Sequence, residues 1–248
     1  MEDLKGKVCI VTGAGKGIGR ETAKLFQRHG ANLALITRTL ADFTDFSTSH
    51  SDNVLMESGD VSDPATVSSF IERVLEKFGR IDVLVNNAGM RFRRPVLGTS
   101  LDEWNLVLQN NLTSVFLFCQ GAGQQMVEQR YGRIINLASI VGTLGLPELS
   151  AYGASKGGII TFSKCLALEW APYNVNVNVI APGFCETSYA GSFKENKPDL
   201  YQFTLDRTPQ DRWGKSEEIG EACLFLASDK SSFITGETIS IDGGWSAW

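Results

Sequence analysis

The sequence Val8-Cys9-Ile10-Val11-Thr12-Gly13-Ala14-Gly15-Lys16-Gly17-Ile18-Gly19 decides the fold expected for this chain. It opens with a short apolar run rich in β-branched side chains, the pattern of a buried strand, and leads directly into glycines. A helix pattern follows over residues 20–29, where Gly30 supplies a stop, and a second strand pattern covers residues 33–37. A strand, a glycine turn, a helix and a strand within about 30 residues predict the βαβ unit of a parallel sheet.

The glycine turn predicts a nucleotide site. The strict G-x-G-x-x-G fingerprint is absent, and the spacing is Thr12-Gly13-x3-Gly17-x-Gly19 instead. Glycines let the backbone approach a pyrophosphate, and the helix that begins beyond them favours an anion at its N-terminus. A turn that only reverses the chain is the alternative. With a strand before it and a helix after it, we expect a nucleotide at Gly13, Lys16, Gly17, Ile18 and Gly19.

The end of the second strand favours NADP(H) over NAD(H). An acidic residue about 20 positions beyond the glycines would hold the ribose 2′-hydroxyl of NAD. Here the sequence is Thr37-Arg38-Thr39, and no carboxylate occurs before Asp42. Arg38 and Lys16 instead offer two cations, and arginine is well suited to a phosphate.

The rest of the chain continues the alternation of strands and helices, without a visible domain boundary or repeat. We expect strands at 54–56, 81–85, 133–137, 174–180 and 237–241, and helices at 63–79, 101–125, 152–170 and 217–226. Residues 40–53 are polar and predict at most one helical turn. Residues 184–215 form a long polar stretch typical of a substrate lid. The whole chain, 1–248, is thus predicted to be one α/β domain built on a doubly wound parallel sheet.

Composition excludes several functions. The net charge is −5, which disfavours a nucleic-acid surface, and no stretch of 18 apolar residues predicts a membrane span. The first apolar run is too short for a secretory signal, so we expect a cytoplasmic protein. Five cysteines lack C-x-x-C or metal spacing, and the two histidines lie in no ligand-like cluster. No metal site is therefore expected.

Tyr152 and Lys156 are the candidate proton-transfer pair. They lie four residues apart in a predicted helix, so both side chains share one face. A phenol has a pKa of ~10, and a nearby cation favours its ionised form. The pair can therefore act as a general acid and base near neutral pH. By itself, however, this spacing is also that of an ordinary amphipathic helix with a solvated lysine.

The order of motifs resembles the short-chain dehydrogenase/reductase family across essentially the whole chain. The motifs are Thr12-Gly13-x3-Gly17-x-Gly19, Asn86-Asn87-Ala88-Gly89, Ser139, Tyr152-x3-Lys156 and Pro182-Gly183. The resemblance implies a sheet of seven parallel strands with helices on both faces, and a homotetramer. It also implies an NADP(H)-dependent interconversion of a secondary alcohol and a ketone on a small-molecule substrate.

The resemblance implies a role for each matching residue. Tyr152 would be the general acid or base, and Lys156 would hold the nicotinamide ribose and lower the pKa of Tyr152. Ser139 would bind the substrate oxygen, and Asn111 would complete a proton relay through water. The cofactor would further contact Asp60 and Val61 at the adenine, Asn87, Ala88 and Gly89 behind it, and Pro182, Gly183 and Thr187 at the nicotinamide.

The substrate is less well defined by the sequence. The segments 87–96 and 207–214 resemble the gluconate 5-dehydrogenase branch, whose substrate is a sugar acid. Arg91, Arg93 and Arg94 would bind its carboxylate, unless they face solvent or another subunit. The alternative is a 3-oxoacyl-carrier-protein reductase. Members of that branch carry a basic pair for the carrier protein, and here Arg130 fits one position but Tyr173 occupies the other.

A nucleotide-sensing protein without turnover is the alternative from another class. The intact set of Ser139, Tyr152, Lys156 and Asn111 argues against it, because a sensor needs no proton-transfer machinery.

Overall fold

A parallel sheet of seven strands forms the centre of the computed structural model, which describes residues 3–43, 52–187 and 190–248. The strand order is β3-β2-β1-β4-β5-β6-β9, and every pairing is parallel. The strands are β1 (Val8–Thr12), β2 (Asn32–Thr37), β3 (Val54–Ser58), β4 (Val83–Asn86), β5 (Gly132–Leu137), β6 (Val175–Pro182) and β9 (Thr238–Ile241). The order reverses between β1 and β4, so the glycine turn and the Asn86-Asn87-Ala88-Gly89 turn meet at the switch point of the sheet.

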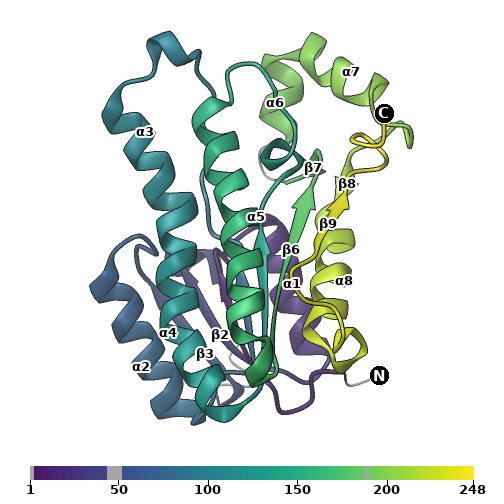
Figure 1. The fold of residues 1–248 in the computed structure, drawn as a ribbon. Helices are drawn as coiled ribbons and strands as arrows, with labels where there is room; N and C mark the ends of the chain where they lie inside the picture. The colour runs from purple at the N-terminus through teal and green to yellow at the C-terminus, as the bar shows by residue number, and fades with distance from the viewer. Residues whose placement is uncertain (1–2, 44–51, 188–189) are drawn as a thin grey trace.

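Helices cover both faces of the sheet, as predicted (Figure 1). One apolar cluster joins the sheet to α2 (Pro64–Phe78), α4 (Ser114–Gln129) and α5 (Ser150–Trp170) through Phe70, Phe118 and Ile159. A second cluster joins the other face to α1 (Gly17–Arg28) and α8 (Ser216–Ala227). None of the helices in the described part of the chain is long and apolar enough to cross a membrane.

The prediction of one continuous helix over residues 101–125 is wrong in two respects. The helix is interrupted, and it ends later than predicted. The chain forms α3 (Leu101–Leu108), then a π-helical turn at Gln109–Thr113, and then α4, which continues to Gln129. π-Helical turns are rare and are often found at functional sites, because the extra residue rotates the side chains that follow. Here the turn contains Asn111, which is completely buried.

The polar stretch 184–215 is not an open loop. It contains α6 (Ala190–Asn196), α7 (Pro198–Asp206) and a small sheet of β7 (Cys185–Glu186) with β8 (Gly214–Lys215). The two helices lie beyond the arrowhead of β6 in Figure 1, above the carboxyl edge of the sheet. Movement of this segment as a lid stays a prediction.

Trp213 organises this segment. The indole is 4% exposed, and its Nε1 donates a 2.8 Å hydrogen bond to Thr204 Oγ1. Its ring lies 5.0 Å from that of Tyr201, 5.5 Å from Phe193 and 5.6 Å from Phe184, between ring centroids. Burying a large aromatic side chain supplies much of the hydrophobic stabilisation that a short polar segment otherwise lacks.

The prediction of at most one helical turn over residues 40–53 can be compared with the structure only in part. A 3₁₀-helix runs over Leu40–Phe43, and residues 44–51 lie outside the described residues.

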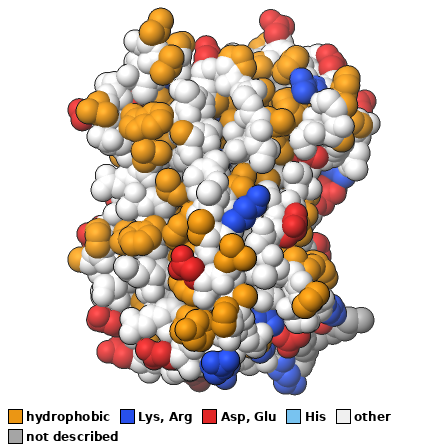
Figure 2. All heavy atoms as spheres, viewed as in Figure 1, with side chains coloured by type: hydrophobic (Ala, Val, Ile, Leu, Met, Phe, Trp, Pro, Cys, Tyr) orange, Lys and Arg blue, Asp and Glu red, His pale blue; other side chains and the backbone are white. Residues whose placement is uncertain are grey.

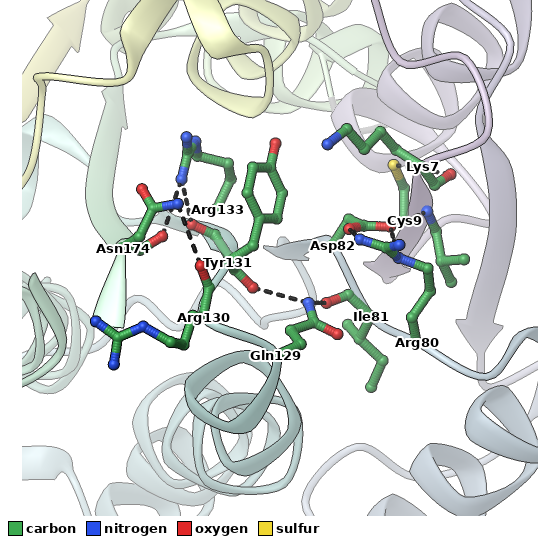
Figure 3. A network of polar contacts seen from close by, with 12 residues as sticks. Lys7, Cys9, Arg80, Ile81, Asp82, Gln129, Arg130, Tyr131, Arg133 and Asn174 are labelled. Atoms are coloured by element: carbon green, nitrogen blue, oxygen red, sulfur yellow. Dashed lines mark hydrogen bonds and ion pairs between the residues drawn. The ribbon is translucent and has the colours of Figure 1, made fainter. Parts of the chain in front are cut away.

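A polar network ties together the opposite, amino-terminal edge of the sheet (Figure 3). Asp82 is fully buried before β4, where its Oδ2 accepts a 2.9 Å hydrogen bond from the Val8 amide. Arg80 donates to both oxygens of the same carboxylate, with Nη2 2.6 Å from Oδ1. Nearby, the Lys7 ammonium lies 3.8 Å from the centre of the Tyr131 ring. This edge contains structural charge pairs, whereas the predicted site residues lie at the other edge.

Candidate active site

A cleft of about 470 Å³ lies at the carboxyl edge of the sheet. Every predicted catalytic and cofactor-binding residue lines it except Gly19 and Asn111. The predicted residues in its wall are Gly13, Lys16, Gly17, Ile18, Arg38, Asp60, Val61, Asn87, Ala88, Gly89, Ser139, Tyr152, Lys156, Pro182, Gly183 and Thr187. The cleft thus runs from Lys16 in the glycine turn and Arg38 after β2 to the candidate catalytic pair on α5, a path that suits an extended dinucleotide.

The glycine turn and Asn87 form one interlocked unit. Asn87 Nδ2 donates to the carbonyls of Thr12, at 3.0 Å, and Gly13, at 3.2 Å. Gly13 has φ +66°, and a Cβ there would lie 2.9 Å from the Ala88 Cα. A Cβ on Gly19 would clash with Asn87 Nδ2 and the Gly13 carbonyl. Gly19 therefore allows the helix to approach the turn, which leaves a cradle free of side chains that fits a pyrophosphate.

A carboxylate that does not line the cleft lies near the two cations predicted to bind the 2′-phosphate. Lys16 and Arg38 are exposed and line the cleft. Asp42 lies close by, since a Cβ on Gly15 would be 2.8 Å from its Oδ2 and equally close to Thr37 Oγ1. The sequence alone does not assign Asp42 a place beside the glycine turn. Gly15 could have indicated this contact, because only a residue without a Cβ lets the Asp42 side chain come so close to the turn.

Lys156 is buried against the end of β5. Its side chain lies at 5% exposure, and its Nζ donates a 2.8 Å hydrogen bond to the Leu137 carbonyl. The same Nζ lies 5.8 Å from the centre of the Tyr152 ring. Burial lowers the pKa of the ammonium from 10.5 to about 8. The lysine is therefore placed beside the phenol by the helix repeat and held there by a backbone carbonyl.

Tyr152 faces Ser139 across the cleft. Burial raises the pKa of the phenol, whereas a hydrogen bond with Ser139 and the positive charge of Arg91 lower it. The resemblance assigned this lowering to Lys156, and that role stays a prediction. Arg91 is the charged group that the structure adds. A phenol beside a hydroxyl and a cation is equipped to exchange a proton with a bound oxygen atom.

Asn111 holds the backbone behind the catalytic pair. Its Oδ1 accepts a 2.7 Å hydrogen bond from the Met90 amide, and its Nδ2 donates to the Met90 carbonyl at 3.0 Å. The same Nδ2 donates to Ser155 Oγ at 3.1 Å. Both amide hydrogens are thus used in positioning Met90 and α5. The implied water relay stays a prediction.

The three arginines of the segment 91–94 lie in different environments. Arg91 lines the cleft. Arg93 Nε lies 2.6 Å from Glu148 Oε2, and Arg94 Nη1 lies 2.8 Å from Glu103 Oε1, so both form ion pairs within the protein. The sequence placed all three at the cleft edge, but the structure places only Arg91 in its wall.

The stability of the cofactor-free protein should rise with pH because of Lys156. Between pH 8 and 10.5 the unfolded chain binds the proton that the folded lysine has released, so the free energy of unfolding rises across that window. The shift corresponds to about 3 kcal/mol. Urea unfolding of the wild type and Lys156→Met across this range measures the effect. The difference between the two proteins should change with pH, and a constant difference would contradict the burial of a titrating ammonium.

Comparisons with known proteins agree with this geometry. The family model described as enoyl-(acyl carrier protein) reductase matches residues 13–246. A 3-oxoacyl-acyl-carrier-protein reductase of Thermotoga maritima is 38% identical over 252 residues, covering 97% of this chain and 98% of that protein. Levodione reductase superposes with a TM-score of 0.93 at 32% identity, covering 98% of this chain and 99% of the other.

A gluconate 5-dehydrogenase from Burkholderia cenocepacia, solved in complex with NADP and tartrate, also superposes with a TM-score of 0.93. It is 31% identical and covers 100% of this chain and 98% of that one. These matches span nearly the whole chain and share the sheet whose carboxyl edge holds Ser139, Tyr152 and Lys156. The chain therefore belongs to the short-chain dehydrogenase/reductase family of oxidoreductases.

Proposed function

We propose that this protein interconverts a secondary alcohol and a ketone with NADP(H), and that its substrate is a sugar acid or polyol. The proposed reaction class rests on one observation: a single cleft is lined by Tyr152, Ser139 and Lys156. NADP(H) is supported by Lys16 and Arg38, and by the NADP bound to the B. cenocepacia gluconate 5-dehydrogenase.

The residues of the cleft divide the chemistry between them. The nicotinamide cofactor supplies or accepts a hydride when bound. In ketone reduction, Tyr152 donates its hydroxyl proton to the carbonyl oxygen, and in alcohol oxidation it removes the proton from the same oxygen. Ser139 donates a hydrogen bond to that oxygen and fixes its position. Lys156 keeps a positive charge beside the phenol and favours its ionised form during turnover.

Reduction of an acyl group on a carrier protein is the second candidate, favoured by the identity to the T. maritima reductase. The surface around Arg130 argues against it. The Arg130 guanidinium lies 5.8 Å from the centre of the Tyr173 ring, and its Nη2 donates a 2.9 Å hydrogen bond to the Pro172 carbonyl. An aromatic ring thus occupies the position at which the second cation for an acidic carrier protein is expected.

The oligomer and cellular location are part of the same proposal. Figure 2 shows hydrophobic side chains on the face formed by α3, α4 and α5. Exposed residues there include Leu101, Phe116 and Leu168, at 73%, 43% and 81%. Such a surface favours assembly into the homotetramer implied by the resemblance. The cytoplasmic location is proposed from the sequence alone.

A substrate panel tests the proposed function. With NADPH as the reductant, 5-ketogluconate, an acetoacetyl thioester and a neutral ketone are offered to the same enzyme. We expect the highest kcat/KM for 5-ketogluconate. A higher value for the acetoacetyl thioester would favour the carrier-protein alternative, and NADPH binding without turnover of any ketone would favour a sensor.

The cofactor preference should depend on Arg38. A charge-assisted hydrogen bond to a phosphate is worth about 1.5–3 kcal/mol, so Arg38→Ala should weaken NADPH binding roughly 10-fold or more and leave NADH binding nearly unchanged. Asp42→Asn should act in the opposite direction, because it removes a negative charge from beside Gly15 in the glycine turn. Fluorescence titration measures both, with the exposed Arg28→Ala as the control. Equal or tighter NADH binding by the wild type would overturn the preference.

A further inference from the structure

We propose that Arg91 binds an anionic group of the substrate, a carboxylate, and that it thereby sets the substrate class of the cleft. This inference rests on the proposed ketone–alcohol chemistry and adds the residue that selects the substrate. Arg91 lies in the cleft wall with Ser139 and Tyr152, so one small molecule can reach all three side chains.

The backbone on which Arg91 lies is fixed from behind. Both polar groups of the Met90 backbone are bound by the Asn111 side chain, at 2.7 and 3.0 Å. Asn111 is completely buried in the π-helical turn, and it also bonds to Ser155 on the catalytic helix. Asn111 therefore ties the backbone next to Arg91 to the catalytic helix, which suits a residue that orients a substrate.

Aromatic rings lie beside the guanidinium of Arg91, a residue that is exposed in the cleft wall. The guanidinium lies 5.5 Å from the centre of the Phe193 ring and 5.9 Å from that of Phe184. Phe184 in turn packs against Trp213 and Trp245. Arginine stacks on aromatic faces, and such contacts limit the orientations open to its guanidinium.

The charge of Arg91 reaches the catalytic centre, since it opposes the rise that burial causes in the pKa of the Tyr152 phenol. A guanidinium forms two parallel hydrogen bonds with a carboxylate, which fixes both the position and the orientation of the bound group. The geometry therefore suits a compact hydroxy or oxo acid that places its carboxylate on Arg91 and its reacting oxygen at Tyr152 and Ser139.

Arg93 and Arg94 provide matched controls from the same segment. Both have an ion-pair partner within the protein, Glu148 for Arg93 and Glu103 for Arg94, and neither lines the cleft. If only net positive charge near the cleft entrance mattered, replacing either of them would have the same effect as replacing Arg91.

Calorimetry on the NADP-bound protein tests the anion site without turnover. L-tartrate serves as the probe, and L-threitol, which has hydroxymethyl groups in place of both carboxylates, is its neutral counterpart. Arg91→Met should weaken tartrate binding roughly 10- to 100-fold, Arg91→Lys should restore part of it, and Arg94→Met should leave it unchanged. Unchanged tartrate affinity in Arg91→Met, equal losses in Arg94→Met, or tighter binding of threitol than of tartrate by the wild type would overturn the proposal.

Kinetics separates this inference from the proposed function. The substrates are 5-ketogluconate and L-sorbose, in which a hydroxymethyl group replaces the carboxylate. Arg91→Met should raise KM for 5-ketogluconate at least about 10-fold and leave L-sorbose kinetics unchanged. If the wild type reduces L-sorbose as well as 5-ketogluconate, the function stands and the inference fails. If it reduces no ketone while its tartrate affinity depends on Arg91, the proposed function fails and the anion site stands. Thermal unfolding of Arg91→Met with NADP checks that its fold is retained.

Discussion

Tyr152→Phe is expected to lower kcat by about 10²- to 10⁴-fold while the affinity for NADPH stays largely unchanged. General acid–base catalysis by a positioned side chain contributes a factor of this size. The substitution removes one hydroxyl and keeps the ring, so Ser139, Lys156 and the glycine turn remain in place. Steady-state kinetics gives kcat, and NADPH fluorescence titration gives the affinity.

Tyr173→Phe is the control for the loss of a phenol. Tyr173 lies outside the cleft, with 38% of its surface exposed and its ring against Arg130. Its variant should show wild-type kinetics. If Tyr152→Phe also retained near wild-type kcat, Tyr152 would not be the proton donor. If it lost NADPH affinity along with activity, the substitution would have disturbed the cofactor site, and the loss of rate would no longer measure proton transfer.

Asp82→Ala is expected to lower the free energy of unfolding by roughly 2–4 kcal/mol, far from the active site. The fully buried carboxylate accepts from the Val8 amide and from Arg80, so its removal leaves a buried N–H without an acceptor. The Arg80 side chain is 50% exposed and can be hydrated, which keeps the loss below that of a completely buried ion pair. Asp82→Asn should cost less, because it retains an acceptor.

Urea unfolding followed by circular dichroism measures this loss. The exposed Asp102→Ala on α3 is the control and should remain close to the wild type. The kcat of folded Asp82→Ala should match that of the wild type, because Asp82 lies before the amino end of β4 and does not line the cleft. A change in kcat without a change in stability would contradict a purely structural role.

The sequence predicts the sheet well because its signals are local. The run Val8–Thr12 is apolar and is followed by glycines with a specific spacing, and Asp63-Pro64 and Gly79 mark the two ends of α2. In the structure Asp63 accepts hydrogen bonds from the Ala65 and Thr66 amides, and Gly79 adopts the left-handed conformation that ends the helix. Such caps depend on neighbouring residues alone and can be read without tertiary information.

The parts of the site that the sequence missed depend on long-range contacts. Arg91, Arg93 and Arg94 look alike in a linear reading, and they differ because Glu148, 55 residues beyond Arg93, folds back to pair with it. The proximity of Asp42 to Gly15 and the π-helical turn around Asn111 also arise from packing between separate segments. No periodic pattern records such contacts, so they become visible only once the segments are assembled.

The interlock of Asn87 with Gly13 and Gly19 has a consequence for evolution and protein engineering. The glycine turn and the Asn86-Asn87-Ala88-Gly89 turn depend on each other, because the Asn87 side-chain amide fills the space left by the absent side chains of Gly13 and Gly19. Transplanting either turn alone from a homologue would introduce a collision or an empty pocket. Recombination that moves both together should preserve cofactor binding, so these positions are expected to change as a set across relatives.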